Sequence, residues 1–248
     1  MQFTNRKILI TGGNSGIGQA LAEALQARGN RIVITGRKQA SLRQMLDRNP
    51  DMAGYMLDVT DEAALAAFPA GLLADHPDLD AAILNAGIME AEDYTADPVS
   101  LDVAERTIAT NLTAPIRLAA ALLPHLQSRP AAALVTVSSG LAFVPKAGNP
   151  VYSASKAAIH SWTQSLRHQL RETSVAIHEI VPPLVATELT PGQSRQAMAL
   201  PLDAFIGEVM GILSQDIVPD EILVERVAFL RNAEAEGRFD AVFTALNG

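Results

Sequence analysis

The feature that most constrains the fold of this chain is a regular alternation of short apolar runs with longer segments of helical pattern. The apolar runs, in chain order, are KILIT, RIVIT, GYML, AAILN, AAALVTVSS and VAIHEIV. Helical patterns lie between them, and we expect helices over about 16–28, 39–47, 61–74, 101–127 and 151–171. Strands that are apolar on both faces and separated by helices form a parallel sheet that is covered on both sides, with right-handed crossovers. We therefore predict an α/β fold, a Rossmann-type doubly wound parallel sheet with helices on both faces.

The chain is long enough for one complete domain. Its 248 residues, 48% of them hydrophobic, suffice for a full core, and no linker-like stretch divides them, so we predict a single domain over residues 1–248. The strict alternation stops after Pro182. We expect about 187–248 to form a substrate loop and a helical C-terminal tail. The stretch over 187–202, TELTPGQSRQAMALPL, is either a lid over the substrate or a plain surface loop.

Composition excludes several classes of function. The net charge of −8, without a long basic run, argues against nucleic acid or an anionic membrane as the main partner. The absence of cysteine excludes a disulfide and a thiolate nucleophile. The histidines lack metal-ligand spacing, so we predict no metal site. The sequence shows neither a signal peptide nor an apolar run of bilayer-spanning length, and we expect a cytoplasmic enzyme.

The first apolar run leads directly into a glycine-rich turn, TGGNSGIG, at 11–18, which opens a helix. Glycines permit the tight turn and let the backbone approach a pyrophosphate, while the helix N-terminus offers free N–H groups to the anion. A glycine-rich turn by itself is often only a turn, but its place between a strand and a helix favours dinucleotide binding. The residues expected to hold the dinucleotide here are Gly12, Asn14, Ser15, Gly16, Ile17 and Gly18.

The second apolar run ends at the basic pair Arg37 and Lys38. An enzyme that uses NAD usually places a carboxylate about 20 residues beyond the glycine turn, yet no acidic residue lies between Glu23 and Asp47. Arg37 and Lys38 instead offer positive charge to a 2′-phosphate. The alternative is that both are ordinary surface residues of a loop. We predict NADP as the preferred cofactor, with NAD also possible.

Tyr152 and Lys156 are separated by four positions, so a helix would place them on one face, one turn apart. Bringing a tyrosine pKa from about 10 to near neutral takes roughly 4 kcal/mol. A lysine ammonium about 4 Å away, at an effective dielectric of about 20, supplies that much. The pair predicts a proton donor and acceptor near pH 7, although such a pair also arises often on a plain surface helix. Ser139 ends an apolar run and is placed to bind the same substrate oxygen; Ser138 competes, and the spacing favours Ser139.

Taken together, these motifs resemble the single-domain branch of the short-chain dehydrogenase/reductase family over about residues 5–190. The stretches VSSGLAFVP and VYSASKAAIHSW are further similar to the DltE-like oxidoreductases of that family. The resemblance implies a catalytic tetrad of Asn111, Ser139, Tyr152 and Lys156. Tyr152 would be the acid/base and Ser139 would orient the substrate oxygen. Lys156 would bind the nicotinamide ribose and lower the tyrosine pKa, and Asn111 would hold a water that links Lys156 to solvent.

The resemblance also implies further cofactor contacts, with Asp58 and Val59 at the adenine, Asn85, Ala86 and Gly87 at the ribose, and Pro182, Val185 and Thr187 near the nicotinamide. For Asn85, a strand-end turn is the competing explanation. The chain departs from the family at Pro182-Pro183, where Pro-Gly is usual, and a second proline restricts the backbone there. It departs again in its last residues, RFDAVFTALN, which put a seventh strand in doubt.

We therefore expect an NADP-preferring oxidoreductase that interconverts a carbonyl and an alcohol by direct hydride transfer. The alternative is an NAD(P)-binding sensor or scaffold without turnover, which would not need Ser139, Tyr152 and Lys156 together. A small-molecule carbonyl or alcohol is the expected substrate, and an apolar pocket wall is expected from Gly140, Leu141, Phe143, Val144, Pro183, Leu184 and Met198. A homodimer or homotetramer is expected from the small residues opposite Tyr152 on its helix, namely Ala154, Ala158, Ser161 and Ser165.

Overall fold

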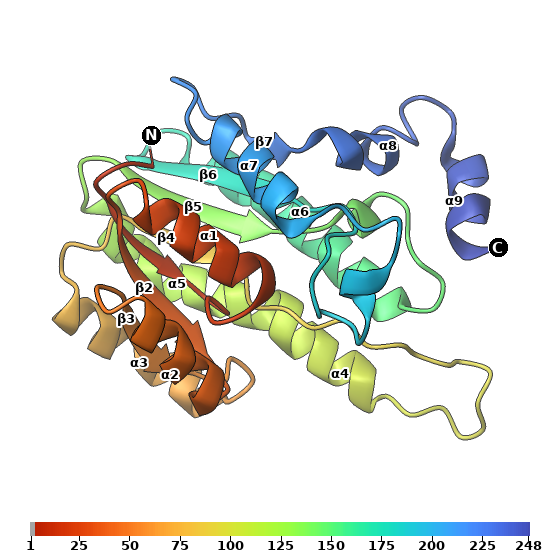
Figure 1. Ribbon diagram of the computed structural model, residues 1–248, viewed down its shortest axis with the longest axis horizontal. Coiled ribbons are helices and arrows are strands. Elements are labelled where there is room, and N and C mark those ends of the chain that lie inside the picture. Colours follow the sequence, from red (N-terminus) through yellow and green to blue (C-terminus); the bar gives the residue numbers. More distant parts are fainter. Residues whose placement is uncertain (1–2) are drawn as a thin grey trace.

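The computed structural model describes residues 3–248, so Met1 and Gln2 of the predicted domain lie outside the described residues. Within that range seven parallel strands form one sheet in the order β3-β2-β1-β4-β5-β6-β7 (Figure 1). The first six are the apolar runs from which the parallel sheet was predicted. No helix of this range is both long and apolar enough to cross a bilayer. The strands are β1 Lys7–Ile10, β2 Arg31–Gly36, β3 Ala53–Met56, β4 Ala81–Leu84, β5 Ala132–Val137, β6 Val175–Val181 and β7 Glu221–Leu223. The α-helices are α1 Gly16–Gln26, α2 Gln39–Arg48, α3 Glu62–Asp75, α4 Asp102–Ile108, α5 Ala114–Gln127, α6 Pro150–Leu170, α7 Leu202–Ile212, α8 Ala228–Arg231 and α9 Phe239–Asn247.

The central strands divide their side chains between two hydrophobic cores. In β1, Ile8 and Ile10 belong to the core shared with α1, α2 and α7, whereas Leu9 belongs to the core shared with α3, α5 and α6. All three side chains are fully buried. Successive residues of a strand point to opposite faces of the sheet. A strand in the middle of this sheet is therefore apolar throughout, and that is the pattern from which the fold was predicted.

The long helix predicted over 101–127 contains one irregular turn. α4 ends at Ile108, a π-helical turn spans Ala109–Thr113, and α5 continues from Ala114. The π-helical turn carries Asn111, whose buried side chain pairs with the backbone of Ile88: Oδ1 accepts from its N–H and Nδ2 donates to its carbonyl, each at 2.9 Å. Single π-helical turns inside α-helices occur frequently at functional sites.

The C-terminal region contains the seventh strand that the sequence put in doubt. β7 runs parallel to β6, with Ile222 fully buried and paired with Ile180. The last residues form the helix α9, as expected, so the strand lies earlier in the chain than the terminus. The prediction of a loop and a helical tail over about 187–248 missed this strand. Three residues are too few to show a strand periodicity, and the strand forms because β6 offers it an edge.

We expect Ile222→Ala to lower the free energy of unfolding by about 2–5 kcal/mol, because it removes a fully buried side chain from the edge of the sheet. Ile217→Ala is the matched control, since Ile217 is 84% exposed and its truncation should change stability by less than about 0.5 kcal/mol. Chemical denaturation measures both variants. An Ile222→Ala variant as stable as the wild type would show that β7 does not belong to the core.

Candidate active site

The chain makes a tight turn after β1 that lets the start of α1 lie against it. Gly12 has a φ of +65°, in the left-handed region that favours glycine. A Cβ on Gly18 would lie 2.4 Å from both the Gly12 carbonyl oxygen and Asn85 Nδ2, so a larger residue does not fit there. Ser15, just before the helix, has an extended backbone, and no side chain of the described residues caps the first N–H groups of α1. These donors are left for an anion.

Asn85 ties this turn to the end of β4. Its Nδ2 donates to the carbonyl oxygen of Thr11 at 2.9 Å, and its backbone N–H donates to the Thr11 hydroxyl at 2.9 Å. The side chain thus has the structural role that the sequence left as the competing explanation. Asn85 also lines the cavity described next, so the two roles coexist.

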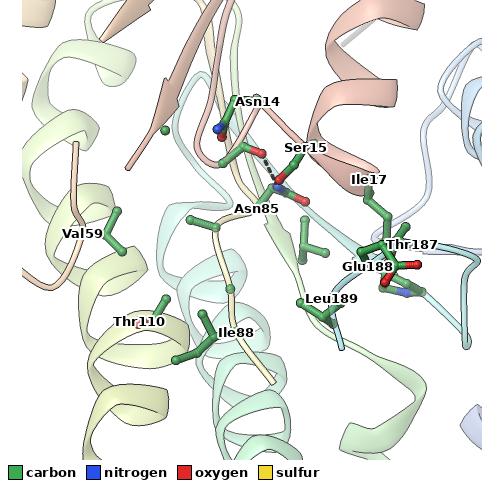
Figure 2. Close-up of a pocket in the computed structure, with 18 of the residues that line it drawn as sticks. Asn14, Ser15, Ile17, Val59, Asn85, Ile88, Thr110, Thr187, Glu188 and Leu189 are labelled. Carbon is green, nitrogen blue, oxygen red and sulfur yellow. Dashed lines mark hydrogen bonds between the residues drawn. The ribbon is translucent and has the colours of Figure 1, made fainter. Parts of the chain in front are cut away.

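A cavity of about 480 Å³ lies at the carboxyl ends of the strands. Figure 2 shows Asn14 and Ser15 near Asn85, with Thr187 and Leu189 approaching from the segment after β6. Parallel sheets bind ligands at this end of their strands, where the connecting loops meet. Every residue that the sequence predicted for the cofactor lines this one cavity, namely Gly12, Asn14, Ser15, Gly16, Ile17, Gly18, Arg37, Lys38, Asp58, Val59, Asn85, Ala86, Gly87, Tyr152, Lys156, Pro182, Val185 and Thr187.

Other residues of the lining were not singled out from the sequence. Ser41 on α2 accepts a hydrogen bond from Asn14 Nδ2 at 2.6 Å, and it reaches the cavity because α2 packs beside the glycine turn. No local pattern marks such a residue. Among the residues that the structure describes, no group of three or more His, Asp or Glu side chains is arranged to hold a metal ion. The further lining residues are Thr35, Gly36, Ser41, Leu57, Ile88, Thr110, Val137, Glu188, Leu189 and Gln193.

Ser139, Tyr152 and Lys156 line the same cavity from the end of β5 and from α6. Tyr152 and Lys156 lie on one face of α6 and are 6% and 5% exposed. Lys156 Nζ lies 5.7 Å from the centre of the Tyr152 ring and donates to the carbonyl oxygen of Val137 at 2.8 Å. Ser139 Oγ accepts from the N–H of Leu141 at 3.1 Å. A phenol, an ammonium and a hydroxyl therefore meet at one wall.

The pKa values of this pair are governed by burial. Burial raises the pKa of Tyr152 to about 12, and a hydrogen bond with the Ser139 hydroxyl acts in the opposite direction. Burial lowers the pKa of Lys156 to about 8, against the attraction of the Glu179 carboxylate. The prediction of a tyrosine pKa near neutral is wrong for this structure, because removing a phenolate from water outweighs the hydrogen bond from Ser139. At pH 7 both Tyr152 and Lys156 hold their protons.

Asn111 lies behind the cavity wall rather than on it. A Cβ placed on Gly87 would lie 3.4 Å from Asn111 Oδ1 and 3.6 Å from Lys156 Nζ, so the amide and the ammonium both approach the space that glycine leaves open. Asn111 Nδ2 also donates to the hydroxyl of Ser155 at 3.2 Å. The amide holds the π-helical turn against the segment after β4 and lies next to Lys156.

The residues predicted to form an apolar pocket wall are separated in the structure. Pro183 lines the cavity. Val144 is buried in a small cluster with Ala233 and Val242 of the C-terminal tail, and Met198 is 76% exposed. The tail covers the turn after β5, a contact between distant parts of the sequence. The predicted wall is therefore not continuous.

The stretch over 187–202 forms an ordered wall of the cavity. Gln193 is 5% exposed, and its Nε2 donates to the carbonyl oxygen of Val185 at 2.9 Å and to the Thr187 hydroxyl at 3.3 Å. Val185 also pairs with Leu200, which returns the stretch to its starting point. These contacts favour the lid over the plain surface loop.

Known proteins resemble this chain along most of its length. The short chain dehydrogenase family matches residues 6–197. The oxidoreductase DltE of Bacillus subtilis is 38% identical, in an alignment that covers all of this chain and 98% of that protein. The 3-oxoacyl-(acyl-carrier-protein) reductase FabG of Salmonella typhimurium is 27% identical, and the alignment covers 95% of this chain and 93% of that protein.

Solved structures show the same fold. A short chain dehydrogenase from Burkholderia cenocepacia, in complex with NADP, superposes with a TM-score of 0.84 at 24% identity and covers 99% of both chains. One from Sphingobium yanoikuyae, in complex with NADPH, superposes with a TM-score of 0.81 at 25% identity and covers 96% of this chain and 95% of that one. Because the family match spans residues 6–197 and the Bacillus protein aligns with the entire chain, this protein belongs to the short-chain dehydrogenase/reductase family of oxidoreductases.

Proposed function

We propose that this protein is an NADP-preferring oxidoreductase that interconverts a carbonyl and an alcohol. The observation that carries the proposal is the single cavity, which joins the glycine turn, the basic pair Arg37 and Lys38, and the buried pair Tyr152 and Lys156. Two structural neighbours are complexes with NADP or NADPH, which supports a cofactor of that class.

The residues present fit a dinucleotide phosphate. Gly12 and Gly18 keep the backbone clear beside the start of α1, so a pyrophosphate would meet free N–H groups there. Arg37 and Lys38 are exposed at the end of β2 and would offer two positive charges to a 2′-phosphate. We assign the adenine to the end of β3, at Asp58 and Val59, and the nicotinamide to the Lys156 end of the cavity.

The proposed roles follow from which of these side chains are protonated at pH 7. The nicotinamide would supply or accept the hydride. Tyr152, with its pKa raised to about 12, keeps a proton that it can give to a carbonyl oxygen. The Lys156 ammonium stabilises the phenolate that remains. Ser139 Oγ accepts from Leu141, so its single O–H can turn from the Tyr152 hydroxyl to the substrate oxygen. Asn111 holds the backbone beside Lys156 in place.

The direct test is to incubate the purified protein with NADPH and a panel of ketones and aldehydes. Turnover is measured as the loss of NADPH absorbance. Turnover of at least one carbonyl is expected. Cofactor binding without turnover of any carbonyl or alcohol would instead favour the NAD(P)-binding sensor.

We expect Tyr152→Phe to lower kcat by at least about 100-fold, because a positioned general acid contributes about 10²–10⁴ in rate. The fold and NADPH binding should be retained, since one hydroxyl is lost. Tyr94→Phe is the control: Tyr94 is 52% exposed and lies outside the cavity lining, so turnover should not change. A Tyr152→Phe variant with wild-type kcat would remove the acid/base role from Tyr152.

We expect Arg37→Ala to weaken NADPH binding by roughly 10- to 100-fold and to change NADH binding little. A hydrogen bond to a charged group contributes about 1.5–3 kcal/mol, and NADH lacks the 2′-phosphate. Arg43→Ala, on the exposed side of α2, is the matched control for loss of one positive charge. Titration of both cofactors by fluorescence measures the effect, and equal losses for the two would exclude Arg37 from the 2′-phosphate site.

We also propose that the protein is a homodimer or homotetramer joined through α6. Ala154, Ser161 and Ser165 are exposed on the side of α6 away from the cavity, and small residues let a second helix approach closely. Ala158→Arg should dissociate the assembly, whereas Ala66→Arg on the exposed side of α3 should not. Light scattering gives the mass, and a wild-type mass of one 26.3 kDa subunit would refute the proposal.

A further inference from the structure

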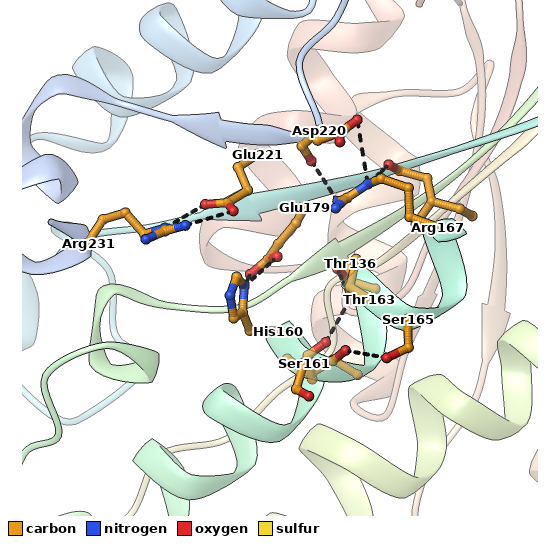
Figure 3. A network of polar contacts seen from close by, with 12 residues as sticks. Thr136, His160, Ser161, Thr163, Ser165, Arg167, Glu179, Asp220, Glu221 and Arg231 are labelled. Atoms are coloured by element: carbon orange, nitrogen blue, oxygen red, sulfur yellow. Dashed lines mark hydrogen bonds and ion pairs between the residues drawn. The ribbon is translucent and has the colours of Figure 1, made fainter. Parts of the chain in front are cut away.

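Two carboxylates, one of them fully buried, lie side by side on β6 and β7 (Figure 3). Glu179 of β6 is fully buried and lies 2.8 Å from His160 Nδ1 of α6. Glu221 of β7 stands opposite Glu179 in the register of the two strands and binds Arg231. Like charges opposite each other on a sheet repel, and a buried ion is costly unless it is paired. Each carboxylate therefore has a cation or a hydrogen-bond donor of its own.

Glu179 is joined to Lys156 by two separate sets of contacts. Along α6, Lys156 and His160 are one turn apart on the same face, and His160 binds Glu179. Across the sheet, Lys156 Nζ donates to the carbonyl oxygen of Val137, and the preceding residue, Thr136, pairs in register with Glu179. The Glu179 carboxylate is thus held near the Lys156 ammonium. Its charge raises the pKa of Lys156, while burial lowers that pKa by a larger amount.

The other charged side chains that face Glu179 are already paired. They come from α6, β7 and α8 and are Arg167, Glu221 and Arg231. Arg231 binds both carboxylate oxygens of Glu221, at 2.6 and 3.0 Å. Arg167 Nε lies 3.5 Å from a carboxylate oxygen of Asp220. Arg167 and Arg231 thus already have carboxylate partners, and Glu179 is the acid whose charge acts on the pKa of Lys156.

We propose that Glu179, held in place by His160, is a positioning residue that keeps Lys156 charged inside the buried site. The inference rests on the proposed function, in which Lys156 acts as an ammonium. A glutamine at this position would make the same hydrogen bond to His160 without burying a charge, so the hydrogen bond does not by itself require a carboxylate. The negative charge of Glu179 stabilises the Lys156 ammonium and so offsets the hydration that the ammonium loses on burial. Tyr152, one turn before Lys156 on α6, is neutral at pH 7 and therefore cannot supply the negative charge.

The test follows the titration of Lys156 directly. The chain has four lysines, Lys7, Lys38, Lys146 and Lys156, so protein labelled with ¹³C at lysine Cε gives a simple NMR spectrum. The signal that is missing from Lys156→Met identifies Lys156. The wild-type midpoint is expected near pH 8. Glu179→Gln should move it to lower pH by about 1 unit or more, because a nearby opposite charge shifts a pKa by about 1–3 units. An unchanged midpoint would overturn the proposal.

Glu225→Gln is the matched control, since it removes the same charge from an exposed side chain of the C-terminal tail and should leave the midpoint in place. Equal shifts in both variants would mean a general charge effect and would also overturn the assignment. If Glu179→Gln does not fold, His160→Gln decides. It keeps a hydrogen-bond donor to Glu179, so the midpoint should stay near that of the wild type, and a fall would contradict the proposal.

NADPH affinity provides a second measurement that separates this inference from the proposed function. A midpoint that moves from about 8 to about 7 lowers the charged fraction of Lys156 at pH 7.5 about threefold, so the Kd of Glu179→Gln for NADPH should rise about threefold. The affinity should recover at pH 6, where Lys156 is charged in both proteins. An equal loss at pH 6 and pH 7.5 would indicate a merely structural defect and count against Glu179. A wild-type protein that binds no NADPH at any pH would refute the proposed function, while the NMR titration would still decide the role of Glu179.

Discussion

Loss of hydration is the constraint on which the chemistry of the candidate site depends. Tyr152 and Lys156 are both almost completely buried, and burial disfavours the charged form of each: it raises the tyrosine pKa to about 12 and lowers the lysine pKa to about 8. Burial therefore keeps Tyr152 protonated but makes it a weaker acid, and it opposes the charge of Lys156. A lysine that tends to lose its proton needs support from a nearby negative charge. The Glu179 carboxylate provides such a charge from the next strand of the sheet.

The parallel sheet brings the site together because all of its strands end on the same side. The glycine turn follows β1, the basic pair follows β2, Asp58 follows β3, and Asn85 follows β4, while Ser139 follows β5 and Thr187 follows β6. Segments separated by more than 100 residues thus line one cavity. The contacts that fix this arrangement are mostly to the backbone, such as those of Asn85 to Thr11 and of Lys156 to Val137. The geometry then depends on the sheet more than on any single side chain.

The C-terminal tail contributes to the surroundings of the site although the family match ends at residue 197. β7 places Glu221 beside Glu179, and α8 supplies Arg231 to neutralise it. Arg231 also lies 4.5 Å from the centre of the Phe143 ring, and Phe143 packs edge-on against His160 with ring centres 4.7 Å apart. The tail thereby covers the turn after β5. It also encloses the charged and polar side chains of Glu179, His160, Glu221 and Arg231 on the far side of Lys156.

The sequence by itself determined the architecture and the glycine turn of the cavity. Apolar runs and helical periods are local, and so is the need for glycine at Gly12 and Gly18, so the doubly wound sheet and this turn follow from the order of the amino acids alone. The other cofactor residues were expected from the family resemblance, and lining residues such as Ser41 and Gln193 were missed. Only the tertiary structure decided β7, which has three residues and forms because β6 offers an edge, and the π-helical turn that carries Asn111. It also decided the pKa of Tyr152, since the spacing from Lys156 says nothing of how much water each group loses.

His160 is one scattered histidine in the sequence, and its partner Glu179 comes from another element. Burial and contacts between distant segments arise from the packing of the whole chain, and no local stretch of sequence contains them.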